Sequence, residues 1–174
     1  MTKAFASVTA LCAAALLAAC AATPAMGPRA QAKLEARSAS TVVGSVTLTQ
    51  VGDKVRIEAN LSGLTPGEHG FHVHEAGDCS APDAVSAKGH FNPGSKGHGH
   101  HHGMDRHAGD LPNLVANASG HATYRAEVGM LTLDKGPMGV VGRSLVVHAD
   151  PDDYKSQPAG NSGKRVACGV IVGS

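Results

Sequence analysis

Two histidines stand two residues apart in the segment GFHVHE, residues 70–75. If this segment is a strand, His72 and His74 project to one face and Val73 to the other, because successive side chains of a strand alternate. Two imidazoles on one face can share a metal ion. The alternative is a pair of solvated surface histidines, and for an isolated pair this is the more common case, so the remaining histidines must decide.

The chain has 11 histidines among 174 residues, an excess that favours metal binding. Further candidates stand at wide intervals: His90, His98, His100, His101, His102, His107 with Asp110, and His148. Neutral imidazoles suit copper and zinc, and one carboxylate added to imidazoles makes a plausible closed zinc site. Because these residues are far apart in sequence, a prefolded scaffold must bring them together.

That scaffold is predicted to be all-β. Val55, Ile57, Ala59 and Leu61 alternate with polar residues, which indicates a strand with one buried face. Residues 51–53 supply a turn before it, so we expect a hairpin. Further strands are expected at residues 70–75, 121–128, 144–148 and 166–172. The 22 glycines are typical of the tight turns of such a fold.

Two long segments without apolar periodicity, residues 76–119 and 149–164, hold most of the unusual chemistry. Loops of this length in a compact domain are usually functional. The chain is long enough for one domain with a real core, and no second domain is needed. From Cys20 onward it carries 14 basic and 14 acidic residues, which does not favour nucleic-acid binding.

The N-terminus is predicted to be an export signal over residues 1–19. One lysine precedes an apolar run too short to span a membrane, and the run closes with Leu17-Ala18-Ala19-Cys20. This ending resembles the bacterial lipoprotein signature, so Cys20 is expected to carry lipid; ordinary cleavage with an incidental cysteine is the alternative. We therefore expect a periplasmic protein anchored to a membrane through lipid, and Ala21 and Ala22, which contain no aspartate retention signal, favour the outer over the inner membrane.

Residues 20–40, rich in Ala, Pro and Ser, are interpreted as a flexible tether between the lipid and the domain. A short helix over residues 31–37 is the alternative for that part of the tether. The domain is then expected to span residues 41–174. A chain that starts near Ser38 should therefore remain active.

The cysteines allow one economical pairing. Cys12 leaves with the signal and Cys20 is assigned to lipid, so Cys79 and Cys168 remain in an oxidising compartment. We expect a disulfide between them, with a thiolate metal ligand as the alternative.

Five patterns occur in order between residue 41 and the C-terminus: GFHVHEAGDCS, GHFNP, RHAGDLPN, VVHADPDD and GNSGKRVACGVI. Together they resemble the copper,zinc superoxide dismutases. The resemblance implies an eight-stranded antiparallel Greek-key β-barrel or sandwich with long metal-binding loops, and it matches the Cys79–Cys168 disulfide.

The resemblance also implies residue roles. His72, His74, His90 and His148 would bind copper, and His90, His98, His107 and Asp110 would bind zinc, so His90 bridges one copper and one zinc per subunit. Asp152 would hydrogen-bond a copper-side and a zinc-side histidine, and Arg165 would attract the substrate anion. His98 is preferred to His100 as the zinc ligand; His100, His101 and His102 are interpreted as a solvated cluster or as a low-affinity metal-loading site.

The implied reaction is the dismutation of superoxide to dioxygen and hydrogen peroxide, with His90 and Arg165 as the catalytic residues. Neither oligomeric state, monomer or homodimer, is favoured by the sequence. The alternative function is a periplasmic copper- and zinc-binding protein on the same fold without turnover. The presence of every expected ligand type, of Asp152 and of Arg165 favours the enzyme.

Overall fold

The computed structural model describes Met1 and residues 27–174. In the described residues, ten strands and one short 3-10 helix follow in chain order: β1 Arg29–Ala36, β2 Val43–Val51, β3 Lys54–Ser62, β4 Gly67–His69, β5 Phe71–His74, η1 Val85–Ala87, β6 Leu114–Ala116, β7 Ala122–Val128, β8 Ser144–His148, β9 Arg165–Val170 and β10 Val172–Gly173. The predicted export signal, residues 1–19, and the lipidation site Cys20 lie outside the described residues.

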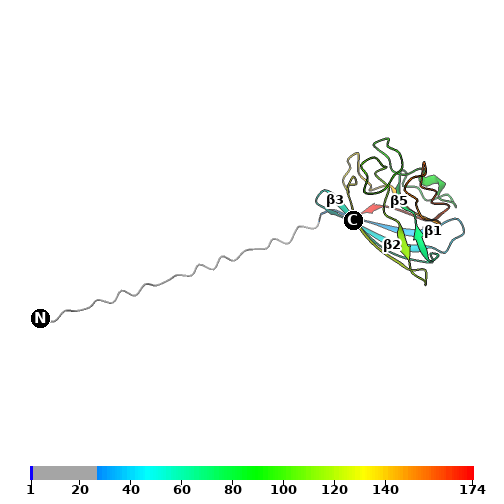
Figure 1. Ribbon diagram of the computed structural model, residues 1–174, viewed down its shortest axis with the longest axis horizontal. Coiled ribbons are helices and arrows are strands. Elements are labelled where there is room, and N and C mark those ends of the chain that lie inside the picture. The colour runs from blue at the N-terminus through cyan, green and yellow to red at the C-terminus, as the bar shows by residue number, and fades with distance from the viewer. Residues whose placement is uncertain (2–26) are drawn as a thin grey trace.

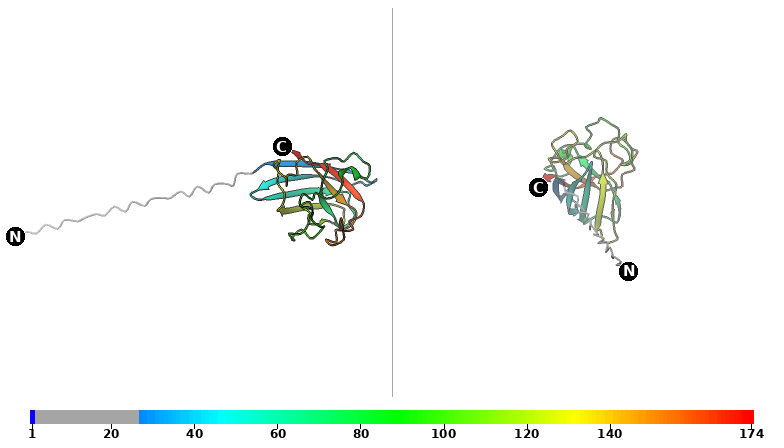
Figure 2. Two further views of the ribbon diagram at one scale, coloured as in Figure 1. Left: turned by 90° about the horizontal axis from the view of Figure 1, so that it is seen from above. Right: turned by 90° about the vertical axis from the view of Figure 1, so that its left-hand side faces the viewer.

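The main sheet has eight antiparallel strands. Its order is β5-β8-β9-β1-β2-β3-β7, with β10 paired to β1, while β4 and β6 form a separate two-stranded sheet. Figure 1 labels β1, β2, β3 and β5. Figure 2 shows the strands side by side, with the long loops outside the sheet. The sheet curls into a half-barrel. The predicted all-β antiparallel fold is therefore confirmed.

The strands predicted from alternation are also present. β2 and β3 form the expected hairpin, joined by Gly52 and Asp53. Gly52 has φ of +59°, a conformation that glycine adopts without the steric cost of a side chain. β5, β7, β8 and β9 occupy the other four predicted segments to within two residues.

The predicted tether is wrong from residue 29 onward. Residues 29–36 form β1, which lies between β9 and β2 in the sheet, and neither a tether nor a helix exists there. Ala30, Ala32 and Leu34 are buried while the intervening side chains face solvent. This is a period-two pattern, but alanines give it a weak hydrophobic signal and the residue types favour helix, so tertiary pairing overrides local propensity.

Side chains of β5 alternate between the hydrophobic core on one face of the sheet and the candidate metal ligands on the other. Phe71 and Val73 belong to the hydrophobic core, together with Leu145 and Val147 of the neighbouring β8. The intervening His72 and the terminal His74 therefore point to the opposite side, where the long loops pack. All four residues of β5 are fully buried, so these histidines lie on a covered face rather than a solvated one.

The long loops are attached to the sheet by covalent and backbone bonds. Cys79 forms the predicted disulfide with Cys168 of β9. Val73 exchanges backbone hydrogen bonds with the loop, donating to Gly109 at 3.0 Å and accepting from Phe91 at 2.8 Å. Within the described part of the chain, no helix is both long and apolar enough to cross a membrane.

Candidate metal centre

Two buried groups of possible metal ligands share one residue. The first contains His72, His74, His90 and His148, and the second contains His90, His98, His107 and Asp110. In each group the ligand atoms, one from each residue, lie within 4.8 Å of one another, and every member is buried. The fold thus brings together all seven positions that the sequence resemblance implies.

In the first group, one ring nitrogen of each histidine bonds a protein oxygen, which leaves the other ring nitrogen for a ligand role. His74 Nδ1 lies 2.9 Å from the carbonyl oxygen of Lys88, and His148 Nδ1 lies 3.3 Å from that of Gly163. Their Nε2 atoms face each other at 3.5 Å. His72 uses Nε2 instead, 2.8 Å from Asp152 Oδ2, so its Nδ1 is the atom left for a ligand role.

In the second group, one carboxylate oxygen gathers three rings. Asp110 Oδ1 lies 2.8 Å from His90 Nδ1, 3.1 Å from His98 Nδ1 and 3.2 Å from His107 Nδ1. The other oxygen, Oδ2, accepts hydrogen bonds from the backbone N–H groups of Gly99 and His107. Three imidazoles and one carboxylate converging in this way are the donor set of a closed zinc site.

Asp152 joins the two groups from behind. Its Oδ2 lies 2.8 Å from His72 Nε2 and its Oδ1 lies 2.8 Å from His98 Nε2, so one buried carboxylate orients a ring in each group. Such outer partners set which nitrogen a histidine presents to a metal. Gly160 packs directly on this bond with φ of +65°, and a Cβ there would overlap Asp152 Oδ1.

Unpaired nitrogens show that the first group fits a metal. His72 Nδ1 and His90 Nε2 are buried and have no hydrogen-bond partner, although buried polar atoms are nearly always paired. Both residues belong to the first group, and their rings lie 3.9 Å apart. A cation bound among these nitrogens would satisfy both atoms. His90 offers Nδ1 to the second group at the same time.

The electrostatics separate the two groups. Burial lowers the pKa of His74 and His148, and neighbouring histidines lower it further. Burial and His72 together lower the pKa of His90 to about 4. Burial also lowers the pKa of His98, but hydrogen bonds to Asp110 and Asp152 outweigh it and raise that pKa to about 9. The first group is therefore a set of neutral imidazoles, the form that binds metal.

Arg165 lies at the mouth of the first group. A cleft of about 420 Å³ is lined by His74, His90, His148 and Arg165, among other residues. A β-bulge between Val147 and His148 places His148 opposite Arg165 across β8 and β9. Bulges near active sites commonly redirect a side chain in this way. A small anion that entered this cleft would meet a guanidinium beside the imidazoles.

The disulfide loop supports this cleft. Cys79 packs against a small cluster formed by Ala84, Ala87, Val146 and Cys168. The carbonyl oxygen of Ala84 accepts a hydrogen bond of 2.7 Å from Arg165 Nη1. The carbonyl oxygen of Lys88, in the same loop, lies 2.9 Å from His74 Nδ1. The covalent link therefore holds the loop that orients both the arginine and one metal-ligand candidate.

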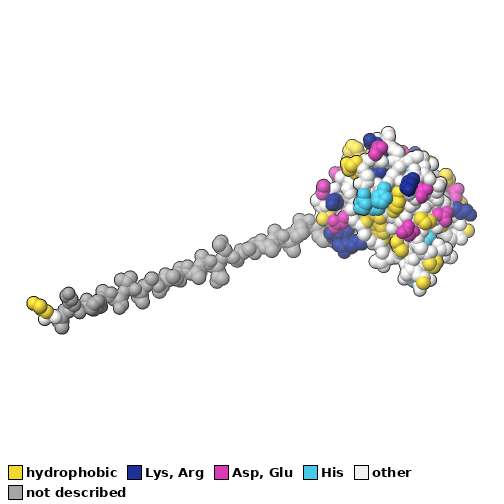
Figure 3. All heavy atoms as spheres, in the orientation of Figure 1, with side chains coloured by type: hydrophobic (Ala, Val, Ile, Leu, Met, Phe, Trp, Pro, Cys, Tyr) yellow, Lys and Arg dark blue, Asp and Glu magenta, His cyan; other side chains and the backbone are white. Residues whose placement is uncertain are grey.

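The remaining histidines lie apart from both groups. His100 and His102 are exposed and His101 is half-buried, and their ring centroids lie 4.1–5.2 Å apart. Histidine side chains gather in one patch on the face seen in Figure 3. His69 is buried, with Nδ1 2.9 Å from the carbonyl oxygen of His148. Of the neighbouring histidines, His98 rather than His100 occupies the second group.

Sequence reasoning missed two side-chain amides at the site. Asn113, which closes the motif RHAGDLPN, exchanges two hydrogen bonds with the backbone of Asp152 at 3.0 and 3.1 Å. Gln157 does the same with the backbone of His98. The motif could have drawn attention to Asn113, whereas Gln157 stands in no quoted pattern and carries no signal of its own.

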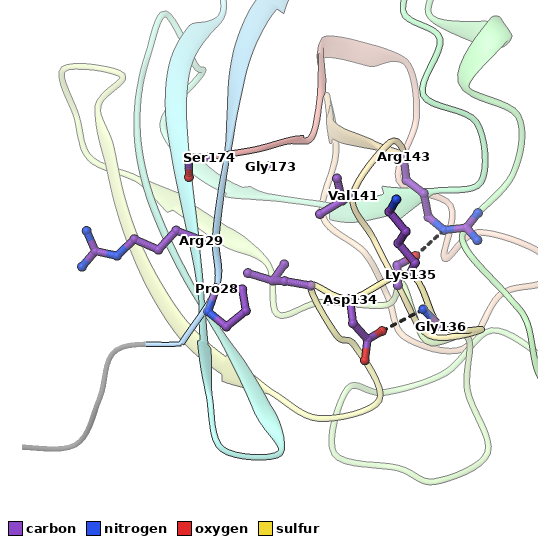
Figure 4. A pocket seen from close by; sticks show the side chains of 11 residues that line it. Pro28, Arg29, Asp134, Lys135, Gly136, Val141, Arg143, Gly173 and Ser174 are labelled. Carbon is purple, nitrogen blue, oxygen red and sulfur yellow. Dashed lines mark hydrogen bonds between the residues drawn. The ribbon is translucent and has the colours of Figure 1, made fainter.

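A second cleft, of about 480 Å³, lies near the start of β1 and the C-terminus (Figure 4). The charged residues Arg29, Asp134, Lys135 and Arg143 line it together with glycine, serine and aliphatic residues. The described residues around it include no histidine or cysteine. The metal chemistry of the described chain is therefore expected at the shared histidine groups and not in this cleft.

Comparisons with known proteins agree with this geometry. Residues 42–171 match the family model described as copper/zinc superoxide dismutase. The chain is 45% identical to two proteins of Aquifex aeolicus (strain VF5), named superoxide dismutase [Cu-Zn] 2 and 1, over 135 and 134 residues. These alignments cover 75% and 74% of this chain and 79% of each relative. The crystal structure of the clock protein EA4 is similar with a TM-score of 0.76 and 42% identity, covering 83% of this chain and 93% of that one.

Proposed function

The chain belongs to the copper/zinc superoxide dismutase family, and from that premise we propose that it is an oxidoreductase that dismutates superoxide at the paired histidine groups. The observation that carries this assignment is His90, a single ring shared by two ligand sets. One superoxide gives up an electron and leaves as dioxygen. A second accepts that electron with two protons and leaves as hydrogen peroxide.

The residues of the first group would hold copper and those of the second would hold zinc. When bound, copper supplies a reversible one-electron change, whereas zinc keeps one oxidation state and contributes fixed charge. Four neutral imidazoles suit the first ion, and three imidazoles with Asp110 suit the second.

His90 is the residue that would manage the proton. Its Nδ1 is held beside Asp110 Oδ1 at 2.8 Å, while its Nε2 has no protein partner. That Nε2 can therefore take up a proton and return it to the departing peroxide. Burial and His72 lower the pKa of this ring to about 4, so the imidazole is neutral near pH 7 and presents a lone pair at Nε2.

Arg165 would bind and orient the anion. Its guanidinium lines the cleft and is fixed by its bond to the Ala84 carbonyl, so the positive charge is placed before superoxide arrives. Asp152 and Asp110 keep the rings in position through their bonds to His72 and His90, and neither carboxylate lines the cleft.

Arg165→Ala is expected to lower the second-order rate with superoxide by about tenfold or more, because the attraction and orientation of the anion are lost. Copper content should stay at one per chain, since Arg165 is no ligand. The measurement is the rate at low and high salt, and the variant should also show a weaker salt dependence. Arg125→Ala, at an exposed arginine on the sheet, is the matched control. Loss of copper from Arg165→Ala would contradict the assigned role.

One experiment distinguishes catalytic dismutation from the alternative function, metal binding without turnover. The chain is loaded with copper and zinc, both metals are quantified, and superoxide decay is followed with and without a chelator. We expect two metals per chain and decay far faster than the spontaneous reaction, abolished by chelation. A chain that holds both metals and leaves the decay unchanged would be a binding protein.

The chain is further proposed to act in the periplasm as a lipoprotein attached at Cys20, the cysteine that closes the apolar N-terminal run. Cys20→Ser is expected to move most of the protein from the membrane fraction of bacterial cells to the soluble fraction. Activity per chain should persist, because the metal residues begin at His72. Cys12→Ser is the control, and unchanged partitioning of Cys20→Ser would contradict the anchor.

A further inference from the structure

Gln157 makes two hydrogen bonds to one residue of another loop. Its Nε2 donates to the carbonyl oxygen of His98 at 2.8 Å, and its Oε1 accepts from the His98 N–H at 2.8 Å. The two residues are 59 positions apart. A side-chain amide used in this way replaces a strand partner and fixes both the position and the orientation of a single residue.

His98 is one of four histidines in the segment GHGHHHG, residues 97–103. Only its ring is buried between Asp110 and Asp152, at 3.1 and 2.8 Å. The rings of His100, His101 and His102 contact one another, and those of His100 and His101 also contact the ring of Tyr154. Ligand chemistry alone does not choose among four imidazoles this close together.

The backbone around His98 has little else to hold it. Glycines stand on both sides, at 97 and 99, and permit the segment to shift. Among the described residues, Gln157 makes the only hydrogen bonds to the His98 backbone. Gly99 is held through its N–H, which donates to Asp110 Oδ2 at 3.1 Å. Gln157 is therefore the residue that fixes the His98 backbone in the described structure.

Asn113 provides the same support to the partner of His98. Its Oδ1 accepts from the N–H of Asp152, and its Nδ2 donates to the carbonyl oxygen of Asp152. Both ends of the 2.8 Å contact between His98 Nε2 and Asp152 Oδ1 are thus held by a side-chain amide. Of the two, only Gln157 acts on the segment that contains competing histidines.

We propose that Gln157 is a positioning residue that selects His98, over His100, His101 and His102, as the histidine of the second metal group. This inference rests on the proposed function, because it takes that group to be the zinc site. Gln157 touches neither substrate nor metal; it acts through the backbone of His98.

The first test is the zinc affinity of the full-length protein, measured by competition with a chromogenic chelator. Gln157→Ala is expected to weaken zinc binding about tenfold, the usual cost of losing an outer partner of a ligand. Gln50→Ala is the matched control, since Gln50 also bonds backbone groups, including the Leu133 N–H, but far from the histidines. Equal affinities of Gln157→Ala and the parent protein would overturn the proposal.

The second test separates selection from general support of the loop. His100, His101 and His102 are all replaced by alanine, in the parent protein and in Gln157→Ala. Zinc affinity should be unchanged in the parent, because His98 is held in place. In Gln157→Ala the replacement should weaken zinc binding several-fold further and change the visible spectrum of Co²⁺ bound in place of zinc, because the spare imidazoles then share the site.

Two outcomes would overturn only the proposal that Gln157 selects His98. One is a change in zinc affinity when the triple replacement is made in the parent protein, and the other is no change when it is made in Gln157→Ala. A parent protein that binds zinc as expected yet does not dismutate superoxide would contradict the proposed function and leave the selection supported. A parent protein that binds no zinc would overturn both.

Discussion

A chain that begins at Ser38 is expected not to fold, whereas a chain that begins at Gly27 is expected to fold and to bind both metals. The difference between them is β1, which pairs with β2 along six residues and with β9 at Glu35 and Ala36. Its removal exposes two strand edges and withdraws Ala30, Ala32 and Leu34 from the core. A domain stabilised by about 5–15 kcal/mol does not tolerate the loss of a central strand.

The measurement is circular dichroism together with the metal content of each truncated protein. The chain from Gly27 serves as the control, because it removes every residue before the described domain and keeps β1 intact. We expect a cooperative thermal transition for this chain and none for the chain from Ser38. A Ser38 chain with a native spectrum and full metal content would show that β1 is dispensable.

His90→Ala is expected to lower the dismutation rate about a hundredfold or more, because it removes the proposed proton carrier and one ligand from each metal group. The two sites should also become independent of each other. In the parent protein the ring of His90 connects them, so occupancy of the zinc site should change the visible spectrum of bound copper. In His90→Ala it should not.

The control for this variant is His121→Ala, at an exposed histidine outside both groups. It should match the parent protein in rate and in spectra. If His90→Ala kept a zinc-dependent copper spectrum, the shared-ring arrangement would be contradicted even where the rate had fallen.

The site combines a rigid strand with two loops that hold each other. His72, His74 and His148 stand on neighbouring strands, so backbone pairing sets their spacing. The second group stands on loop residues, and its order comes from Asp110, from Asp152 and from side-chain amides. Long loops of this kind remain precise only where polar bonds restrain their backbone.

Much of this protein was accessible from its sequence. Alternation of apolar and polar residues identified β3, and turn residues identified its hairpin, because a sheet with one buried face repeats every two residues. The spacing of His72 and His74 already placed both rings on one face. The cysteine count led to the disulfide that the structure contains. Ordered motifs carried the family resemblance and with it the set of ligand candidates.

Only the tertiary structure decided the rest. β1 is a strand because β2 and β9 offer partners on both sides, information that the helix-favouring residues 29–36 do not contain. The resemblance preferred His98 to His100 without a physical reason; in the structure Gln157, 59 residues away, bonds the His98 backbone and holds that ring in the site. In both cases the deciding contact is non-local, and local sequence patterns record only the preferences of neighbours along the chain.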